Sequence, residues 1–175
     1  MDPLLSILIV NWNTRDLLLD CLRSLREAAI AMPFELIVVD NASTDGSAEA
    51  VSRAFPEARL IANAENVGFA RANNQALAES RGELLLLLNP DTVVAPGQIE
   101  RMLGYMQAHP RCGILGPKLL NPDGSFQLSA VPFIEPWDLY WEYARFPRSL
   151  QPRAQKAPRR LYPFEPWRAM PVDYV

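Results

Sequence analysis

Amide and carboxylate side chains follow four short apolar runs of the sequence, at the point where each run ends. They are Asn11, Asp40, Asn41, Asn63, Asn89 and Asp91. If the runs are adjacent parallel strands, these side chains share one edge of the sheet, which is where open α/β sheets bind ligands. Turn formation alone is the alternative, because Asn and Asp are common after any strand. Recurrence after four strands favours a polar binding crevice.

Three of the charged residues indicate which ligand this crevice would take. Asp91 at a strand end suits Mg²⁺ or Mn²⁺, which takes one or two protein carboxylates and leaves its other positions to water and phosphate. Asp40 could accept a hydrogen bond from a base N–H or a ribose hydroxyl. Arg71 lies in the first turn of a predicted helix, where it could face a phosphate or a base, and a solvated arginine is the alternative. Together these residues predict a nucleotide diphosphate with a divalent cation.

The elements that would position these residues alternate between strands and helices. We predict strands at 4–10, 34–39, 58–63 and 84–88, and helices around 17–25, 48–54, 68–80 and 96–108. This order, with short apolar strands, predicts a three-layer α/β/α sandwich with a mostly parallel central sheet covered on both faces. Asn13 or Thr14 would cap the first helix, Gly82 would end the third, and Pro96 would stand in the first turn of the fourth. The letters "NPDG" at 121–124 predict a hairpin-like turn.

Composition narrows the class of protein. A length of 175 residues suits one domain, and a net charge of −3 gives no reason to expect a nucleic-acid partner. His109 is the only histidine, and Cys21 and Cys112 lack the spacing of a metal site. The glycine motifs of dinucleotide-binding folds and P-loops are missing from the sequence. With neither a membrane-length apolar run nor the basic start of a signal peptide, the sequence predicts a soluble cytoplasmic protein.

The C-terminal part differs from the rest in composition. Half of the 16 prolines lie in residues 126–175, and six basic residues with no acid among them lie between Ala144 and Leu161. We therefore expect a regular domain at 1–125 and an irregular segment at 126–175. Residues 137–160 combine aromatic and basic side chains, which indicates either a loop packed on the sheet or a peripheral contact with the inner face of the plasma membrane.

Four motifs of the chain, taken together, resemble those of a known family. "SILIVNWNT", "LIVVDNASTDGS", "NVGFARANNQAL" and "LLLLNPDTVV", in this order and at this spacing, are similar to the family 2 glycosyltransferases of the GT-A fold. The resemblance covers about residues 5–125 and is closest to the bacterial rhamnosyltransferase-like branch. It implies an inverting enzyme of polysaccharide biosynthesis, which transfers a sugar from a nucleotide-diphospho-sugar, such as a dTDP- or UDP-sugar, to a glycan or lipid-linked acceptor.

The resemblance also implies roles for individual residues around the nucleoside. Val10 would touch the base, and Asn11 would lie beside the nucleoside at the end of the first strand. Asp40 would accept a hydrogen bond from the base, and Asp45 would border the same site.

The remaining implied roles concern the phosphates, the ribose and the metal. Arg71 would lie near the base and the phosphates, Asn89 would face the ribose, and Asp91 would hold Mg²⁺ or Mn²⁺. The family's commonest pattern has an acid where Asn89 stands, so this chain has one negative charge fewer beside the metal.

The general base of the reaction has no candidate in the sequence. An inverting transfer needs a base for the acceptor hydroxyl, and in the family it follows an apolar strand that would begin near "PVDYV". The carboxylates that remain do not match the base motif: Asp123, Asp138, Glu142 and Asp173. We therefore expect a truncated, donor-binding portion that ends at the start of the acceptor-side region. The alternatives are a non-catalytic nucleotide-sugar-binding module of the same fold and a structural domain whose polar strand ends are only turns.

Overall fold

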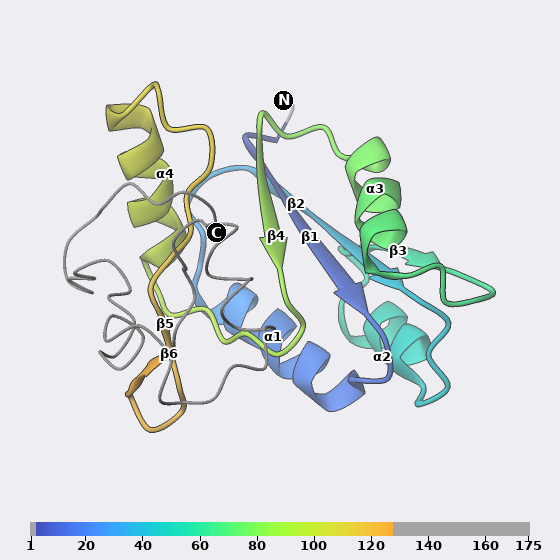
Figure 1. The fold of residues 1–175 in the computed structure, drawn as a ribbon. Helices are drawn as coiled ribbons and strands as arrows, with labels where there is room; N and C mark the ends of the chain where they lie inside the picture. The colour runs from blue at the N-terminus through green and yellow to red at the C-terminus, as the bar shows by residue number, and fades with distance from the viewer. Residues whose placement is uncertain (1–2, 128–175) are drawn as a thin grey trace, which may run out of the picture. The chain divides into compact units, whose positions relative to one another are not determined.

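The computed structural model describes residues 3–127 and confirms the predicted alternation of strands and helices (Figure 1). The elements in chain order are β1 (Leu5–Asn11), α1 (Arg15–Glu27), β2 (Phe34–Asp40), α2 (Ser47–Ala54), β3 (Arg59–Ala62), α3 (Phe69–Glu79), β4 (Leu84–Leu88), α4 (Gln98–Ala108), β5 (Leu119–Leu120) and β6 (Phe126–Gln127). The chain divides into two units, Met1–Gln107 and Ala108–Val175, and the predicted boundary near residue 125 lies inside the second.

The first unit is built on a parallel sheet whose strands are ordered β3-β2-β1-β4. The chain starts in a central strand, adds β2 and β3 on one side, and then crosses over to place β4 on the other. Asn11 of β1 lies opposite Asp40 of β2, and Ile9 of β1 lies opposite Leu88 of β4. The polar residues that follow the strands therefore lie along one edge of the sheet, as the sequence predicts.

The two faces of the sheet are covered unequally. Alternate side chains of a strand point to opposite faces, so Ile7 and Ile9 pack in a core shared with α1, α2 and α4, while Leu8 and Val10 pack against α3. The α3 side of that second core is made of alanines, which let the helix lie close to β1 and β2. Figure 1 shows α3 on one side of the sheet, with α1 and α2 on the other.

The leucine-rich strand β4 differs from its prediction. Five consecutive leucines predict a strand buried on both faces, but their burial alternates, and Leu85 and Leu87 are 44% and 59% exposed. The reason is the strand order: β4 is at the edge of the four-stranded sheet, and α3 packs on β1 and β2. Coverage of both faces is confirmed for the central strands and is wrong for β4 within the described part of the chain.

The third helix matches its predicted extent of 68–80 to within one residue, but the roles predicted for Gly82 and Pro96 are wrong. The third helix ends at Glu79 and not at Gly82, and Gly82 instead lies against β1, where a Cβ atom would come within 2.5 Å of the Ser6 nitrogen. The fourth helix begins at Gln98, because Gly97 adopts a positive φ of 75° after Pro96 and interrupts the helical turn. Non-local packing therefore explains the glycine that local sequence reasoning assigned to a helix end.

Within the second unit, the structure describes a short hairpin. β5 and β6 are antiparallel, and the turn between them closes with a 2.8 Å bond from the Gly124 nitrogen to the Asn121 carbonyl, as the "NPDG" sequence predicts. The predictions for 137–160, and those for Asp138, Glu142 and Asp173, lie outside the described residues. Among residues 3–127, no helix is long and apolar enough to span a membrane.

Candidate functional site

The centre of the polar edge is a buried pair formed by Asn11 and Asp40. These cross-strand neighbours are 0% and 3% exposed, and Asn11 Nδ2 donates to Asp40 Oδ1 at 2.8 Å. Asp40 Oδ2 accepts from the Ser43 backbone nitrogen at 2.9 Å. Each carboxylate oxygen thus accepts one hydrogen bond from an uncharged donor, and a carboxylate can accept about four. Asp40 forms no ion pair within residues 3–127, so its charge and part of its acceptor capacity are not used.

The loops after β1 and β2 are tied together by short polar side chains that sequence reasoning did not assign to the site. Ser43 Oγ accepts from the Asn13 backbone nitrogen at 2.8 Å and from Asn11 Nδ2 at 3.1 Å. Asn13 Oδ1 in turn accepts from the Thr44 nitrogen at 2.8 Å, with Asn13 at a positive φ of 55°. The turn-forming sequence "NASTDGS" predicts a loop after β2. It does not predict that this loop bonds to Asn13, about 30 residues earlier in the chain.

Asp45 holds the first turns of two helices. Its Oδ2 accepts from the Arg15 nitrogen at 2.8 Å at the start of α1, and its Oδ1 accepts from the Ser47 nitrogen at 3.1 Å at the start of α2. Burial alone would raise the pKa of Asp45, but hydrogen bonds from Ser47 and Arg15 outweigh it and lower the pKa. Thr14, one of the two predicted caps, occupies the N-cap position of α1, but its side chain forms no capping hydrogen bond, and its hydroxyl donates to Asn11 Oδ1 at 2.6 Å instead.

A shallow hollow of about 300 Å³ lies over the start of α1. Its lining consists of Asn13, Thr14, Arg15, Asp16, Leu17 and Asp45. Asp45 is the one predicted site residue in this lining, so the hollow borders the polar edge and does not contain the Asn11–Asp40 pair.

A network of amides positions the start of α3. Asn41 is buried, and its Oδ1 accepts from the Val67 nitrogen at 3.0 Å and from Asn63 Nδ2 at 3.2 Å. Its Nδ2 donates to Asn66 Oδ1 at 2.7 Å, and Asn63 exchanges two hydrogen bonds with Gln75. The polar residues that end β2 and β3 therefore fix the loop that leads into α3.

Arg71 and Asp91 are the exposed charges at this edge. Arg71 is in the first turn of α3, next to the buried Ala72, and Asp91 follows β4 within the turn that the 3.2 Å bond from the Thr92 nitrogen to the Asn89 carbonyl closes. Neither charged side chain forms a hydrogen bond or an ion pair with any residue of the described range 3–127. Asn89 is exposed as well.

This edge could hold a divalent cation only if a phosphate-bearing ligand and water complete its coordination. No group of three His, Cys, Asp or Glu side chains that could hold a metal occurs among the described residues. An exposed, unpaired carboxylate such as Asp91 nevertheless suits Mg²⁺ or Mn²⁺, which commonly binds one or two carboxylates and takes phosphate and water as its other ligands. The residues present therefore fit a cation that arrives with a phosphate-bearing ligand.

Sequence comparison relates most of the chain to one family. The family described as "Glycosyl transferase family 2" matches residues 6–165. An N-acetylglucosaminyl-diphospho-decaprenol L-rhamnosyltransferase of Mycobacterium tuberculosis is 33% identical over 114 residues, which are 58% of this chain and 37% of that protein. The O-antigen biosynthesis protein RfbC of Myxococcus xanthus is 32% identical over 132 residues, 74% of this chain and 10% of that protein. The chain thus spans well under half the length of these curated relatives.

Solved structures share the fold. The mannosyltransferase PcManGT from Pyrobaculum calidifontis, in complex with GDP-Man and Mn²⁺, superposes with a TM-score of 0.57 at 25% identity, over 70% of this chain and 37% of that one. S. aureus TarS in complex with UDP superposes with a TM-score of 0.54 at 23% identity, over 63% of this chain and 33% of that one.

Proposed function

The chain belongs to glycosyltransferase family 2, and from that premise we propose that it binds a nucleotide-diphospho-sugar together with Mg²⁺ or Mn²⁺ for an inverting transfer to a glycan or lipid-linked acceptor. Its GT-A fold is the predicted three-layer α/β/α class. The observation that carries the proposal is the edge at the strand ends: a buried Asn11–Asp40 pair in the middle, flanked by the exposed and unpaired charges of Arg71 and Asp91.

Recognition of the nucleoside is assigned to the ends of the two central strands. Asp40 would accept from a base N–H with the acceptor capacity that Asn11 and Ser43 leave, and Val10 and Asn11 would contact the nucleoside. Asp45 would border this region from the loop before α2. The named relative that acts as an L-rhamnosyltransferase supports the rhamnosyltransferase-like branch, and a dTDP- or UDP-sugar would be the donor.

Recognition of the diphosphate is assigned to the two exposed charges. Asp91 would hold the cation, which neutralises charge on the diphosphate leaving group, and Asn89 would face the ribose. Arg71 would contact the phosphates or the base, and it projects from the first turn of α3, where the helix N-terminus also favours an anion. Because position 89 is Asn, Asp91 is the one carboxylate that this turn would offer to the cation.

The acceptor side completes the proposal. Transfer to a sugar or lipid-linked hydroxyl requires a general base that takes its proton, and we assign none of the described residues to that step. The donor-binding role therefore rests on residues 3–127, and turnover belongs to the protein as a whole. A preparation that binds the donor without turnover would support the alternative of a binding module.

Removal of the Asp91 carboxylate tests the proposal most directly. We expect Asp91→Ala to abolish the enhancement by Mn²⁺ of UDP or dTDP binding in isothermal titration, with the melting temperature unchanged because the side chain is exposed and unpaired. Glu83→Ala is the matched control, since Glu83 is an exposed carboxylate at the opposite end of β4. Equal binding by Asp91→Ala and Glu83→Ala would overturn the assignment of the metal to Asp91.

A further inference from the structure

Helix α1 offers two small polar side chains to the loop that follows β4. Cys21 and Ser24 are both buried, and their spacing of three residues places them on the same face of the helix. Ser24 Oγ donates to the Cys21 carbonyl at 2.7 Å and accepts from the Val94 backbone nitrogen at 2.9 Å. The serine hydroxyl thus joins a carbonyl of the helix to the loop 70 residues further along the chain.

Cys21 holds the same loop at its beginning. Its Sγ donates to the Asn89 carbonyl at 3.8 Å, within the reach of a sulfur hydrogen bond. Burial raises the pKa of the thiol to about 12, and the neighbouring Asp91 carboxylate acts in the same direction. The thiol is therefore a neutral donor at physiological pH and a poor nucleophile.

Apart from Val94, which packs against the hydrophobic core, the loop has few other means of support. Strand pairing of β4 with β1 ends at Leu88, and β4 is the edge strand of the described four-stranded sheet. Beyond Leu88, the Thr92 nitrogen bonds within the loop to the Asn89 carbonyl, while the contacts to α1 fix both ends of residues 89–94. The Asp91 side chain makes no hydrogen bond of its own within residues 3–127. Its place therefore depends on the backbone that Cys21 and Ser24 hold.

We propose that Cys21 and Ser24 are positioning residues that fix the Asn89–Val94 loop and thereby present Asp91 to the cation and its diphosphate. The proposal rests on the role of Asp91 in the proposed function. Partners that orient a ligand residue commonly change metal affinity by about 10–100-fold when they are removed. Neither side chain would touch the nucleotide.

The main test measures UDP binding, with and without Mn²⁺, in variants of Cys21 and Ser24. We expect Ser24→Ala to weaken UDP binding in the presence of Mn²⁺ by roughly tenfold and to leave UDP binding without metal unchanged. Cys21→Ala should act in the same direction, and Cys21→Ser should recover part of the loss, because serine keeps a donor for the Asn89 carbonyl at that position. Val51→Ala is the control, since it opens a cavity in the same core at a buried residue of α2.

Two further measurements separate this proposal from the proposed function. In the double variant Ser24→Ala with Asp91→Ala, the serine substitution should cost nothing further, because coupled residues are not additive. Amide hydrogen exchange should rise at Thr92 and Val94 in Ser24→Ala and not in Val51→Ala.

The outcomes are distinct. Unchanged Mn²⁺-dependent binding in both Ser24→Ala and Cys21→Ala, or the same loss in Val51→Ala, would overturn the positioning role while leaving Asp91 as the metal residue. An Asp91→Ala variant that keeps its Mn²⁺ response would instead overturn the proposed metal role. In that case the exchange of Thr92 and Val94 alone decides whether α1 holds the loop.

Discussion

Two polar pairs join the central strands β1 and β2 at opposite ends of the sheet. Ser6 lies opposite Glu35 at the amino end, and Asn11 lies opposite Asp40 at the carboxyl end. In both pairs the neutral side chain of β1 donates to the carboxylate of β2, at 2.6 Å and 2.8 Å respectively. The two ends thus use the same kind of pair.

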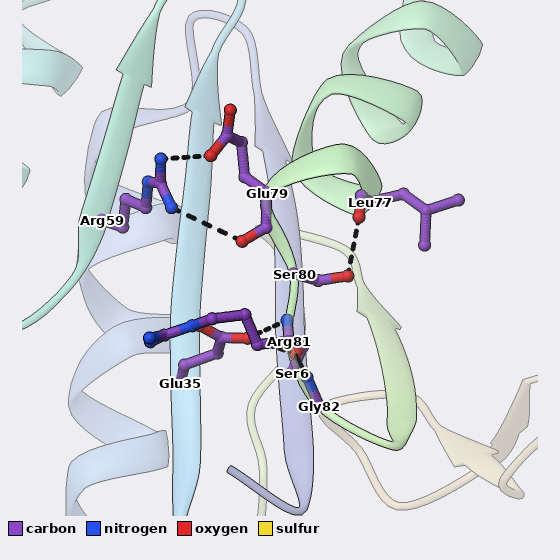
Figure 2. A network of polar contacts seen from close by, with 8 residues as sticks. All are labelled: Ser6, Glu35, Arg59, Leu77, Glu79, Ser80, Arg81 and Gly82. Carbon is purple, nitrogen blue, oxygen red and sulfur yellow. Dashed lines mark hydrogen bonds and ion pairs between the residues drawn. The ribbon is translucent and has the colours of Figure 1, made fainter. Parts of the chain in front are cut away.

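The pairs differ in what else the carboxylate binds. Glu35 accepts from the Arg81 backbone nitrogen at 2.5 Å and from two nitrogens of the Arg81 guanidinium at 3.1 and 3.2 Å (Figure 2). Close by, Arg59 forms an ion pair with Glu79. Asp40 has only Asn11 and a backbone nitrogen as donors. The charge of Glu35 is thus compensated within the fold, whereas Asp40, Asp91 and Arg71 form no ion pair within residues 3–127 and, in the proposed function, would meet the ligand.

The largest expected effect comes from the amino end. Gly82→Ala would place a Cβ atom 2.5 Å from the Ser6 nitrogen and 2.7 Å from the Leu5 carbonyl carbon, and backbone atoms cannot move aside cheaply. We expect a loss of about 2–3 kcal/mol in the free energy of unfolding, measured in urea. Nucleotide affinity of the folded fraction should be unchanged.

The control for this substitution is a second glycine of the chain. Gly104 lies inside α4 with open space where a Cβ would be, so Gly104→Ala should stabilise the protein by about 0.5–1 kcal/mol. A tolerated Gly82→Ala would show that the amino end is not closely packed, and the contrast between the two ends would weaken.

A matched pair of amide substitutions separates the two carboxylates. Asp40→Asn should weaken UDP or dTDP binding by about 1–3 kcal/mol, the scale of a lost charge-assisted hydrogen bond. Glu35→Gln should leave nucleotide affinity unchanged and reduce stability by about 1 kcal/mol, because the Arg81 guanidinium is largely exposed. Isothermal titration measures the nucleotide affinity of each variant, and urea unfolding measures its stability. Equal affinity in Asp40→Asn and wild type would make Asp40 a structural residue like Glu35.

The smallest effect is the pH dependence that Glu35 adds to stability. Burial alone would raise the pKa of Glu35, but hydrogen bonds from Ser6 and Arg81 outweigh it and hold the pKa below its ordinary value of 4.5. A lowered pKa in the folded state means that this stabilisation is complete above about pH 4.5 and is lost as the pH falls through the folded-state pKa.

Unfolding in urea between pH 3 and pH 7 measures this contribution. In Glu35→Gln the free energy of unfolding should fall less steeply toward acid than in wild type, and the two curves should run parallel above about pH 5. An identical acid slope in the two proteins would mean that Arg81 and Ser6 do not favour the ionised form of Glu35.

Residues close together in the sequence determined much of this protein. The period of apolar residues located the strands and helices of the first unit, and the turn residues at 121–124 located the hairpin, because both signals depend on neighbours within a few positions. The order of strands and helices also implied a parallel sheet with its polar strand ends on one edge, where Asn11, Asp40 and Asp91 lie.

Only the tertiary structure decided how those residues are supported and exposed. The exposure of Leu85 and Leu87 follows from the edge position of β4, and the sequence of a strand does not state its neighbours. The hydrogen bonds that Arg81 donates to Glu35 and that the Val94 nitrogen donates to Ser24 join residues 46 and 70 positions apart. Such contacts depend on how the whole chain packs. The local sequence therefore determined which residues lie at the carboxyl edge of the sheet, and long-range packing determined which of their charges have no partner in the described part of the chain.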